Sequence, residues 1–343
     1  MEGPRLSFHF NSRILGVAQR LLFYRFDIET MVGEMLCASF NHNGSYLACG
    51  FDNGFAVYQC NPFQRLFSRR FLTGGIGIIQ LLDESNIIAV VGGGSKPLFS
   101  PNSVLIWNDK VARFVAELRV HTKVSSIRVT NKLIIVVTIT HVYIFDLKTL
   151  KKIQEYPTYE NSYGVVAANS KVFVISGNEK GSLRIISESS GVLHLEAHDN
   201  IVRAISLSDE GSLLATVSER GTLIRLYNVN SGEKYQILRR GVDKATVCSL
   251  TISNDEKYLI CISDKQMLYL FAVSENINAT SLTTIFTTES KSIAKLQLRE
   301  DVCAVYMVDA QSIFLVSVSG QISWLSLGGD MQLKVHTTSQ LAI

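Results

Sequence analysis

Two adjacent arginines, Arg239 and Arg240, are the residues of this sequence best suited to bind an anion. A guanidinium group keeps its charge at physiological pH and binds phosphate oxygens through two parallel N–H donors. Neighbouring residues of an extended strand point to opposite sides, so the two side chains can serve two separate pockets. Gly241 follows directly and would let the chain turn there. The pair therefore predicts a phosphate-binding position.

Other patterns that suggest chemistry have simpler explanations. His194, Glu196 and His198 alternate, so a strand would place them on one face, but no further ligands accompany them and we expect no metal site. The glycines of GGIGI (74–78) and VGGG (91–94) form neither GxGxxG before a helix nor GxxxxGK[ST], so tight turns explain them. We also find no nucleophile elbow and no carboxylate pair in a catalytic setting. The sequence thus predicts a protein that is not an enzyme and needs no cofactor.

The composition predicts a compact chain with a well-buried core. Hydrophobic residues make up 47% of the 343 residues and charged residues 18%, which argues against extensive disorder. The net charge of +3 is too small for a protein that binds nucleic acid by bulk electrostatics. The sequence has no apolar run as long as a membrane span and no secretory leader, and its six cysteines form no CxxC pair. We therefore expect a soluble, cytoplasmic protein with reduced thiols and no transmembrane segment.

Short runs rich in Val, Ile, Tyr and Phe, separated by Gly, Asn, Asp and Ser clusters, predict an all-β chain. A unit of strand, acidic turn, strand, turn and strand recurs, because residues 38–58 resemble residues 205–227 and, more weakly, residues 250–271. The turn residues Gly211 and Glu256 are 45 positions apart, which is the length of one β-propeller blade. At that period the chain holds about seven blades. We expect a seven-bladed β-propeller with WD-like repeats.

A propeller must close into a ring, because a four-stranded blade can bury its two apolar faces only against neighbouring blades. Closure usually places both ends of the chain in one blade. We therefore expect a single domain, residues 1–343, in which a strand from residues 1–33 pairs with the strands near 313–327. Arg20–Phe26 is the candidate strand.

Several motifs resemble those of the PROPPIN family, the phosphoinositide-binding β-propellers. The most specific are SERGTLIR (218–225) and LRRG (238–241), and GFAVYQCNPF (54–63) and SPNSVLIWND (100–109) agree in order and spacing. The resemblance covers roughly residues 35–343. A random arginine pair is most often a solvated strand end, but the flanking motifs favour a binding role here.

In this family such a pair lies between two blades and supports two phosphoinositide sites on the rim. The resemblance implies that the first site combines one arginine of the pair with an imidazole, hydroxyl groups and a second arginine. Its members would be His198, Thr216, Ser218, Thr222, Arg225 and Arg239. Turn hydrogen bonds within the blade also explain Thr216, Ser218 and Thr222, and that role could coexist with ligand binding. For His198, a hydrogen bond within the blade and a binding role are about equally well supported.

The second site would use the other arginine and residues of the following blade. Its members would be Arg240, Thr246, Ser263 and Lys265. The family usually continues SDKGTVH where this chain reads SDKQMLY, so Gln266 and Met267 replace Gly-Thr and Tyr269 replaces a histidine. Because a hydroxyl is lost and bulk is added, we expect a weaker or altered second site.

A third contact in the family is a loop that dips into the bilayer, and its counterpart here is Ser274–Thr288. Its only sizeable apolar groups are Leu282, Ile285 and Phe286, so any insertion would be shallow. A plain connection with Thr-rich β propensity explains the segment slightly better.

The resemblance implies a non-enzymatic adaptor that recognises phosphatidylinositol 3-phosphate and/or the 3,5-bisphosphate in autophagy or endosomal traffic. Such a protein would be recruited from the cytoplasm to autophagosomal precursors, endosomes or the vacuole or lysosome. Implied partners include a lipid-transfer protein, which contacts the region of Lys96–Asn102 in some relatives. The alternative is a WD-repeat scaffold that binds proteins and no lipid. Internal salt bridges holding both arginines would favour the scaffold.

Overall fold

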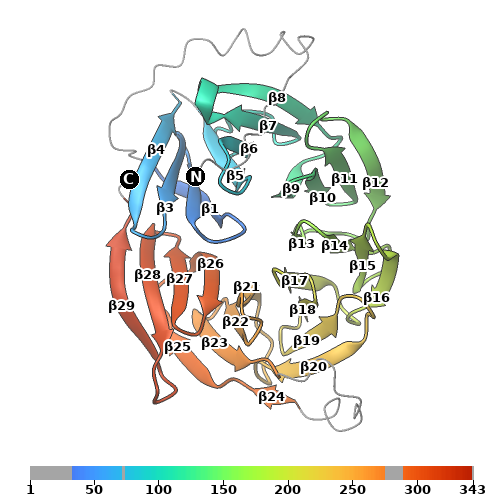
Figure 1. Cartoon of the computed structure of the whole chain (residues 1–343), viewed down its shortest axis with the longest axis vertical. Coiled ribbons are helices and arrows are strands. Elements are labelled where there is room, and N and C mark those ends of the chain that lie inside the picture. The colour runs from blue at the N-terminus through green and yellow to red at the C-terminus, as the bar shows by residue number, and fades with distance from the viewer. Residues whose placement is uncertain (1–32, 72–73, 275–288, 342–343) are drawn as a thin grey trace.

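The structure is a computed structural model that describes residues 33–71, 74–274 and 289–341. Its strands form seven sheets that stand around a central opening (Figure 1). The prediction of an all-β, seven-bladed propeller is therefore confirmed. The 3₁₀ turn η3 (Asp109–Val111) is the only helical element in this part of the chain. No helix of the described ranges is long and apolar enough to cross a membrane.

Each blade runs from an inner strand at the channel to an outer strand at the rim, with antiparallel neighbours. Blades 1 to 4 consist of β1 (Met35–Phe40), β2 (Tyr46–Phe51), β3 (Gly54–Gln59), β4 (Gln64–Arg70); β5 (Gly75–Leu81), β6 (Ile87–Gly93), β7 (Ser103–Asn108), β8 (Arg113–Arg119); β9 (Val124–Val129), β10 (Leu133–Thr138), β11 (His141–Asp146), β12 (Lys152–Pro157); β13 (Val166–Ala168), β14 (Val172–Ser176), β15 (Ser182–Ser187) and β16 (Gly191–Glu196). Blades 5 to 7 consist of β17 (Val202–Leu207), β18 (Leu213–Ser218), β19 (Leu223–Asn228), β20 (Lys234–Arg239); β21 (Val247–Ile252), β22 (Tyr258–Ser263), β23 (Met267–Ala272), β25 (Ala294–Gln297); β26 (Val302–Asp309), β27 (Ser312–Ser317), β28 (Gln321–Leu327) and β29 (Leu333–Gln340). A short strand, β24 (Ser290–Lys291), joins the outer edge of blade 5.

The core lies between the blades. All six residues of β18 are buried, because blade 5 is covered on both faces. Across the seam to blade 6, Val217 and Leu226 pack with Leu250 and Leu259. Similar clusters join the other blades, so the hydrophobic driving force holds the ring closed as well as folding each blade.

The ring closes between blade 7 and blade 1 by packing of side chains. Leu47 and Tyr58 of blade 1 lie in one buried cluster with Val316 and Ile322 of blade 7. In blade 7, β28 pairs with β27 and β29, so the four strands that the structure describes in this blade all lie within residues 302–340. We expected a strand from residues 1–33 to pair with this blade. The candidate strand Arg20–Phe26 lies outside the described residues.

The repeat seen in the sequence corresponds to equivalent turns. Gly44, Gly211 and Glu256 each lie in the turn between the first and second strand of a blade, and each has a left-handed backbone conformation. Their φ angles are 67°, 74° and 57°. The alignment of these turns explains why the repeat was visible in the sequence.

Gly221 and Gly241 offer a matched test of glycine in the motifs around the arginine pair. Gly221 has φ 65°, and an added Cβ would lie 1.9 Å from the carbonyl oxygen of Ala245. Gly241 has neither a left-handed φ nor an atom within 4 Å of an added Cβ, although the chain bends directly after it. We expect Gly221→Ala to lower the free energy of unfolding by about 2 kcal/mol or more. Gly241→Ala should leave the free energy of unfolding, measured by urea titration, nearly unchanged. Equal losses of stability in both variants would show that neither the left-handed φ nor the close carbonyl requires glycine at Gly221.

Candidate functional site

The two arginines separate at the end of β20 as the alternation of an extended chain predicts. The Arg239 side chain is 34% exposed at the rim, whereas Arg240 is only 5% exposed and reaches toward blade 6. The backbone N–H of Arg240 donates to the carbonyl of Thr222, which fixes the chain against the turn between β18 and β19. The two guanidinium groups therefore occupy different environments.

Neutral groups hold Arg240. Its Nε donates to the carbonyl of Gly221, and one Nη donates to the carbonyl of Asp243. The other Nη lies 3.5 Å from the hydroxyl of Tyr269, and the guanidinium carbon lies 5.7 Å from the centre of that ring. Tyr269, which stands in place of the family's histidine, thus forms one wall of the second predicted site.

Arg239 is paired with a carboxylate. Its Nε donates to Glu289, which directly precedes β24. This hydrogen bond raises the pKa of Arg239 and lowers the pKa of Glu289. Sequence reasoning missed Glu289, because 50 residues separate the partners and only the pairing of β24 with β20 brings them together.

Three of the residues predicted for the first site form one hydrogen-bonded chain across blade 5. The imidazole Nε2 of His198 lies 2.9 Å from the hydroxyl of Thr216, and that hydroxyl donates to the carbonyl of Arg225 at 3.2 Å. Arg225 in turn donates to the carbonyl of Ala197 at 2.5 Å. Burial, with a further contribution from Arg225, lowers the pKa of His198 to about 4. His198 is therefore a buried neutral imidazole that is hydrogen-bonded within the blade.

The remaining members of the first site border the turn between β18 and β19. Ser218 and Thr222 are buried on either side of Gly221. Arg239 lies across from Leu223, the neighbour of Thr222, in the pairing of β19 with β20. Among the described contacts, none joins the Arg239 side chain to the other five members, so a ligand would have to bridge them.

The second site is built on the equivalent turn of blade 6. Ser263 is buried, Thr246 is half-buried and Lys265 is exposed. The amide of Gln266 donates to the carbonyl of Ser263 at 3.0 Å, as the amide of Gly221 does to that of Ser218 at 2.9 Å. Gln266 has φ 55°, a conformation that favours glycine. The departure from the family motif therefore leaves the turn intact.

One buried polar atom in each predicted site has no hydrogen-bond partner among the described residues. These atoms are Nε of Arg225 in the first site and Oγ of Ser263 in the second. Buried donors and acceptors are nearly always satisfied by protein or by ordered water. Each predicted site therefore holds one buried polar atom that no described residue satisfies.

The predicted membrane-contact residues Leu282, Ile285 and Phe286 lie outside the described residues. Ser274, at the start of that segment, is tied to β20: its amide donates to the side chain of Gln236 at 3.2 Å, and the hydroxyl of Tyr235 donates to its carbonyl.

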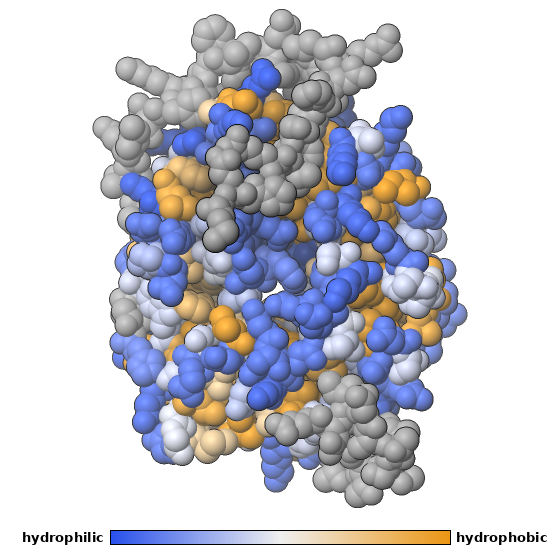
Figure 2. Space-filling view, in the orientation of Figure 1, coloured by the Kyte–Doolittle hydropathy of each residue, from blue (hydrophilic) through white to orange (hydrophobic). Residues whose placement is uncertain are grey.

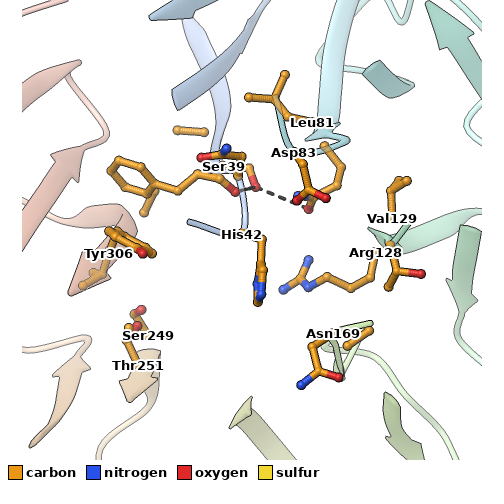
Figure 3. Close-up of a pocket in the computed structure, with 18 of the residues that line it drawn as sticks. Ser39, His42, Leu81, Asp83, Arg128, Val129, Asn169, Ser249, Thr251 and Tyr306 are labelled. Atoms are coloured by element: carbon orange, nitrogen blue, oxygen red, sulfur yellow. Dashed lines mark hydrogen bonds between the residues drawn. The ribbon is translucent and has the colours of Figure 1, made fainter. Parts of the chain in front are cut away.

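The central channel offers a polar cavity of about 530 Å³, lined by inner strands of six blades. Figure 3 shows Arg128 pointing toward His42 inside it. Arg128 donates to the adjacent carbonyl of Ile127 at 2.9 Å, and His42 lies 3.8 Å from Asp209. None of the residues predicted for the two rim sites lines this cavity. Across the described ranges, no group of three His, Cys, Asp or Glu side chains is arranged to hold a metal ion.

The comparisons with known proteins agree with the motifs. The PROPPIN family model matches residues 34–298. This chain belongs to the PROPPIN family. Two relatives are both called SVP1-like protein 2. The Neurospora crassa protein is 34% identical over 246 residues, which cover 71% of this chain and 57% of the relative. The Schizosaccharomyces pombe protein is 31% identical over 247 residues, which cover 70% of this chain and 68% of the relative.

A plant relative and solved structures extend this relationship. Autophagy-related protein 18e of Arabidopsis thaliana is 30% identical over 251 residues, covering 71% of this PROPPIN and 67% of the relative. The crystal structure of Kluyveromyces marxianus Hsv2 superposes with a TM-score of 0.78 at 21% identity, covering 91% of this chain and all of the other. A complex of KlAtg21 with the coiled coil of AgAtg16 gives 0.74 at 16% identity, covering 90% and 99%. These structures share the propeller fold.

The buried imidazole predicts a pH dependence of stability. An unfolded histidine has a pKa near 6.5 and His198 one of about 4, so the unfolded chain binds more protons between these values. The free energy of unfolding should therefore fall by about 3 kcal/mol as the pH drops through that window. His198→Gln should remove this contribution, whereas His194→Gln, at an exposed position of β16, should keep it. Urea titrations at about pH 7 and about pH 4.5 measure the difference; identical pH dependence in both variants would contradict the structural role.

The strained turn of blade 6 predicts a stabilising substitution. Gln266→Gly should raise the free energy of unfolding by about 0.5–1 kcal/mol. The substitution removes the strain of a residue with a Cβ in a left-handed conformation, and this gain exceeds the extra backbone entropy that glycine loses on folding. Gln311 also lies in a turn but has no left-handed φ, so Gln311→Gly should destabilise. Thermal and urea unfolding of both variants test this, and a loss of stability in Gln266→Gly would show that the turn is not strained.

Proposed function

We propose that this PROPPIN binds the headgroup of phosphatidylinositol 3-phosphate, and/or of the 3,5-bisphosphate, at the rim between blades 5 and 6. The observation that carries this proposal is the divergence of Arg239 and Arg240 toward two sites, each with an unsatisfied buried polar atom. Phosphate oxygens match the geometry of both guanidinium groups. The protein acts as an adaptor without catalysis, recruited to autophagic, endosomal or vacuolar membranes.

The affinity of one site is modest by this mechanism. A hydrogen bond to a charged group contributes about 1.5–3 kcal/mol, so a few contacts to one headgroup give weak binding. Two sites on one membrane surface raise the overall affinity through effective concentration. The face seen in Figure 2, down the propeller axis, has hydrophilic residues around the central opening and apolar residues scattered among them.

The alternative, a scaffold that binds only proteins, is less well supported. Internal salt bridges at both arginines would favour the scaffold. Among the described residues, however, the side chain of Arg240 contacts two carbonyls and a tyrosine. Protein partners remain part of the adaptor proposal. The loop Lys96–Asn102, where a lipid-transfer protein would dock, is held to β5 by two hydrogen bonds between Gly75 and the backbone of Lys96 and Leu98.

Liposome co-sedimentation tests the proposal. The natural protein should sediment with vesicles that contain phosphatidylinositol 3-phosphate and not with vesicles that lack it. Arg239→Thr with Arg240→Thr should lower the bound fraction by about tenfold or more, since two charge-assisted contacts are lost. Arg239→Thr alone is measured as well, because it leaves buried Arg240 in place and so tests binding without the loss of stability that replacing Arg240 causes.

The matched control removes two positive charges from another rim position. Arg113 and Arg119 are exposed on the outer strand β8 of blade 2, so Arg113→Thr with Arg119→Thr should bind as the natural protein does. Sedimentation that is independent of the lipid and of Arg239 would favour the protein-only scaffold.

A further inference from the structure

A short strand brings a carboxylate from the chain of blade 6 against the first predicted site of blade 5. β24 pairs in parallel with β20, with Leu238 opposite Ser290 and Arg239 opposite Lys291. All the other named strand pairs in the described ranges are antiparallel, so this contact is an addition to the regular blade (Figure 1). Glu289 is thereby delivered to the guanidinium of Arg239.

Side chains of β20 hold this addition in place. The amide of Gln236 donates to the hydroxyl of Ser290 at 3.2 Å, and its oxygen accepts from the backbone of Ser274 at 3.2 Å. Tyr235 also donates to the carbonyl of Ser274. Glu289 is therefore positioned by the fold and does not meet Arg239 by free rotation of a long surface side chain.

The pair is accessible to a competing anion. The side chain of Arg239 is 34% exposed and that of Glu289 is 33% exposed. An exposed ion pair is weak, equivalent to about a 1.5- to 5-fold effect on an equilibrium. A phosphate monoester carries more charge than a carboxylate and can accept both N–H groups of a guanidinium fork.

We propose that Glu289 is a built-in competitor that a headgroup phosphate must displace from Arg239, and that it thereby sets the charge that a ligand needs. This inference rests on the proposed function. A phosphate monoester, with a charge between −1.5 and −2 at about pH 7, displaces the carboxylate. The singly charged diester phosphate of a bulk phospholipid is attracted to Arg239 little more strongly than Glu289 is, so it does not displace the carboxylate. The released carboxylate returns to water, because it is already partly exposed.

Glu289→Gln is the test, with Glu233→Gln as its control. Glu233 lies on the same blade and is exposed, and its side chain contacts the hydroxyl of Ser231 at 3.5 Å. Both substitutions remove one negative charge, but only the first frees Arg239. The natural protein and both variants are titrated with phosphatidylcholine vesicles that carry either phosphatidylinositol 3-phosphate or phosphatidylserine, and thermal unfolding confirms that all are folded.

We expect Glu289→Gln to bind the 3-phosphate vesicles about 2- to 5-fold more tightly and to gain at least as much on phosphatidylserine, so that selectivity falls. Glu233→Gln should bind as the natural protein, and the gain should vanish when Arg239→Thr is added. Unchanged binding, an equal gain from Glu233→Gln, or a gain that persists without Arg239 would overturn the competition while leaving the proposed function intact. If neither the natural protein nor Glu289→Gln binds the 3-phosphate vesicles, both proposals fail.

Discussion

Each blade of this propeller is covered on both faces by its neighbours, and this packing constrains where polar groups can lie. β18 is buried along its whole length, and clusters such as the one that contains Val217 and Leu250 run from blade to blade. A charged side chain placed there would lose its hydration without compensation. A charged group within a blade therefore needs hydrogen-bond partners, as Arg225 of β19 has in the carbonyl of Ala197. The arginine pair lies at the end of an outer strand, where one side chain reaches the rim and the other enters the seam.

Much of this arrangement was predictable, because it depends on local rules. The turn residues Gly211 and Glu256 revealed the blade length, since each repeat needs the same left-handed turn. The divergence of Arg239 and Arg240 followed from strand alternation. A hydrogen-bonding role of His198 within its blade was one of two interpretations of that residue. The sequence could not choose between them, because it does not show how deeply the imidazole is buried, and the structure pairs His198 with Thr216.

The unpredicted features depend on contacts between distant segments. Glu289 has no motif around it, and its role arises only because β24 crosses from the chain of blade 6 to the edge of blade 5. The outer strand of blade 7 is β29, far along the sequence from blade 1, and strand propensity alone cannot say which segments of a chain pair. Tyr269 was interpreted as a loss for the second site, whereas its ring and hydroxyl both face Arg240.

These contacts imply that the two sites differ in how readily they accept an anion. At the first proposed site, a headgroup phosphate would replace one partly exposed ion pair, and Arg239 is already oriented by the strand. At the second, Arg240 is buried, and two carbonyls and the ring of Tyr269 already satisfy it. A phosphate there must add to those contacts or replace several of them at once, because leaving a buried carbonyl unpaired is costly. The first site should therefore dominate the affinity, and the second should contribute mainly once a membrane holds the two headgroups side by side.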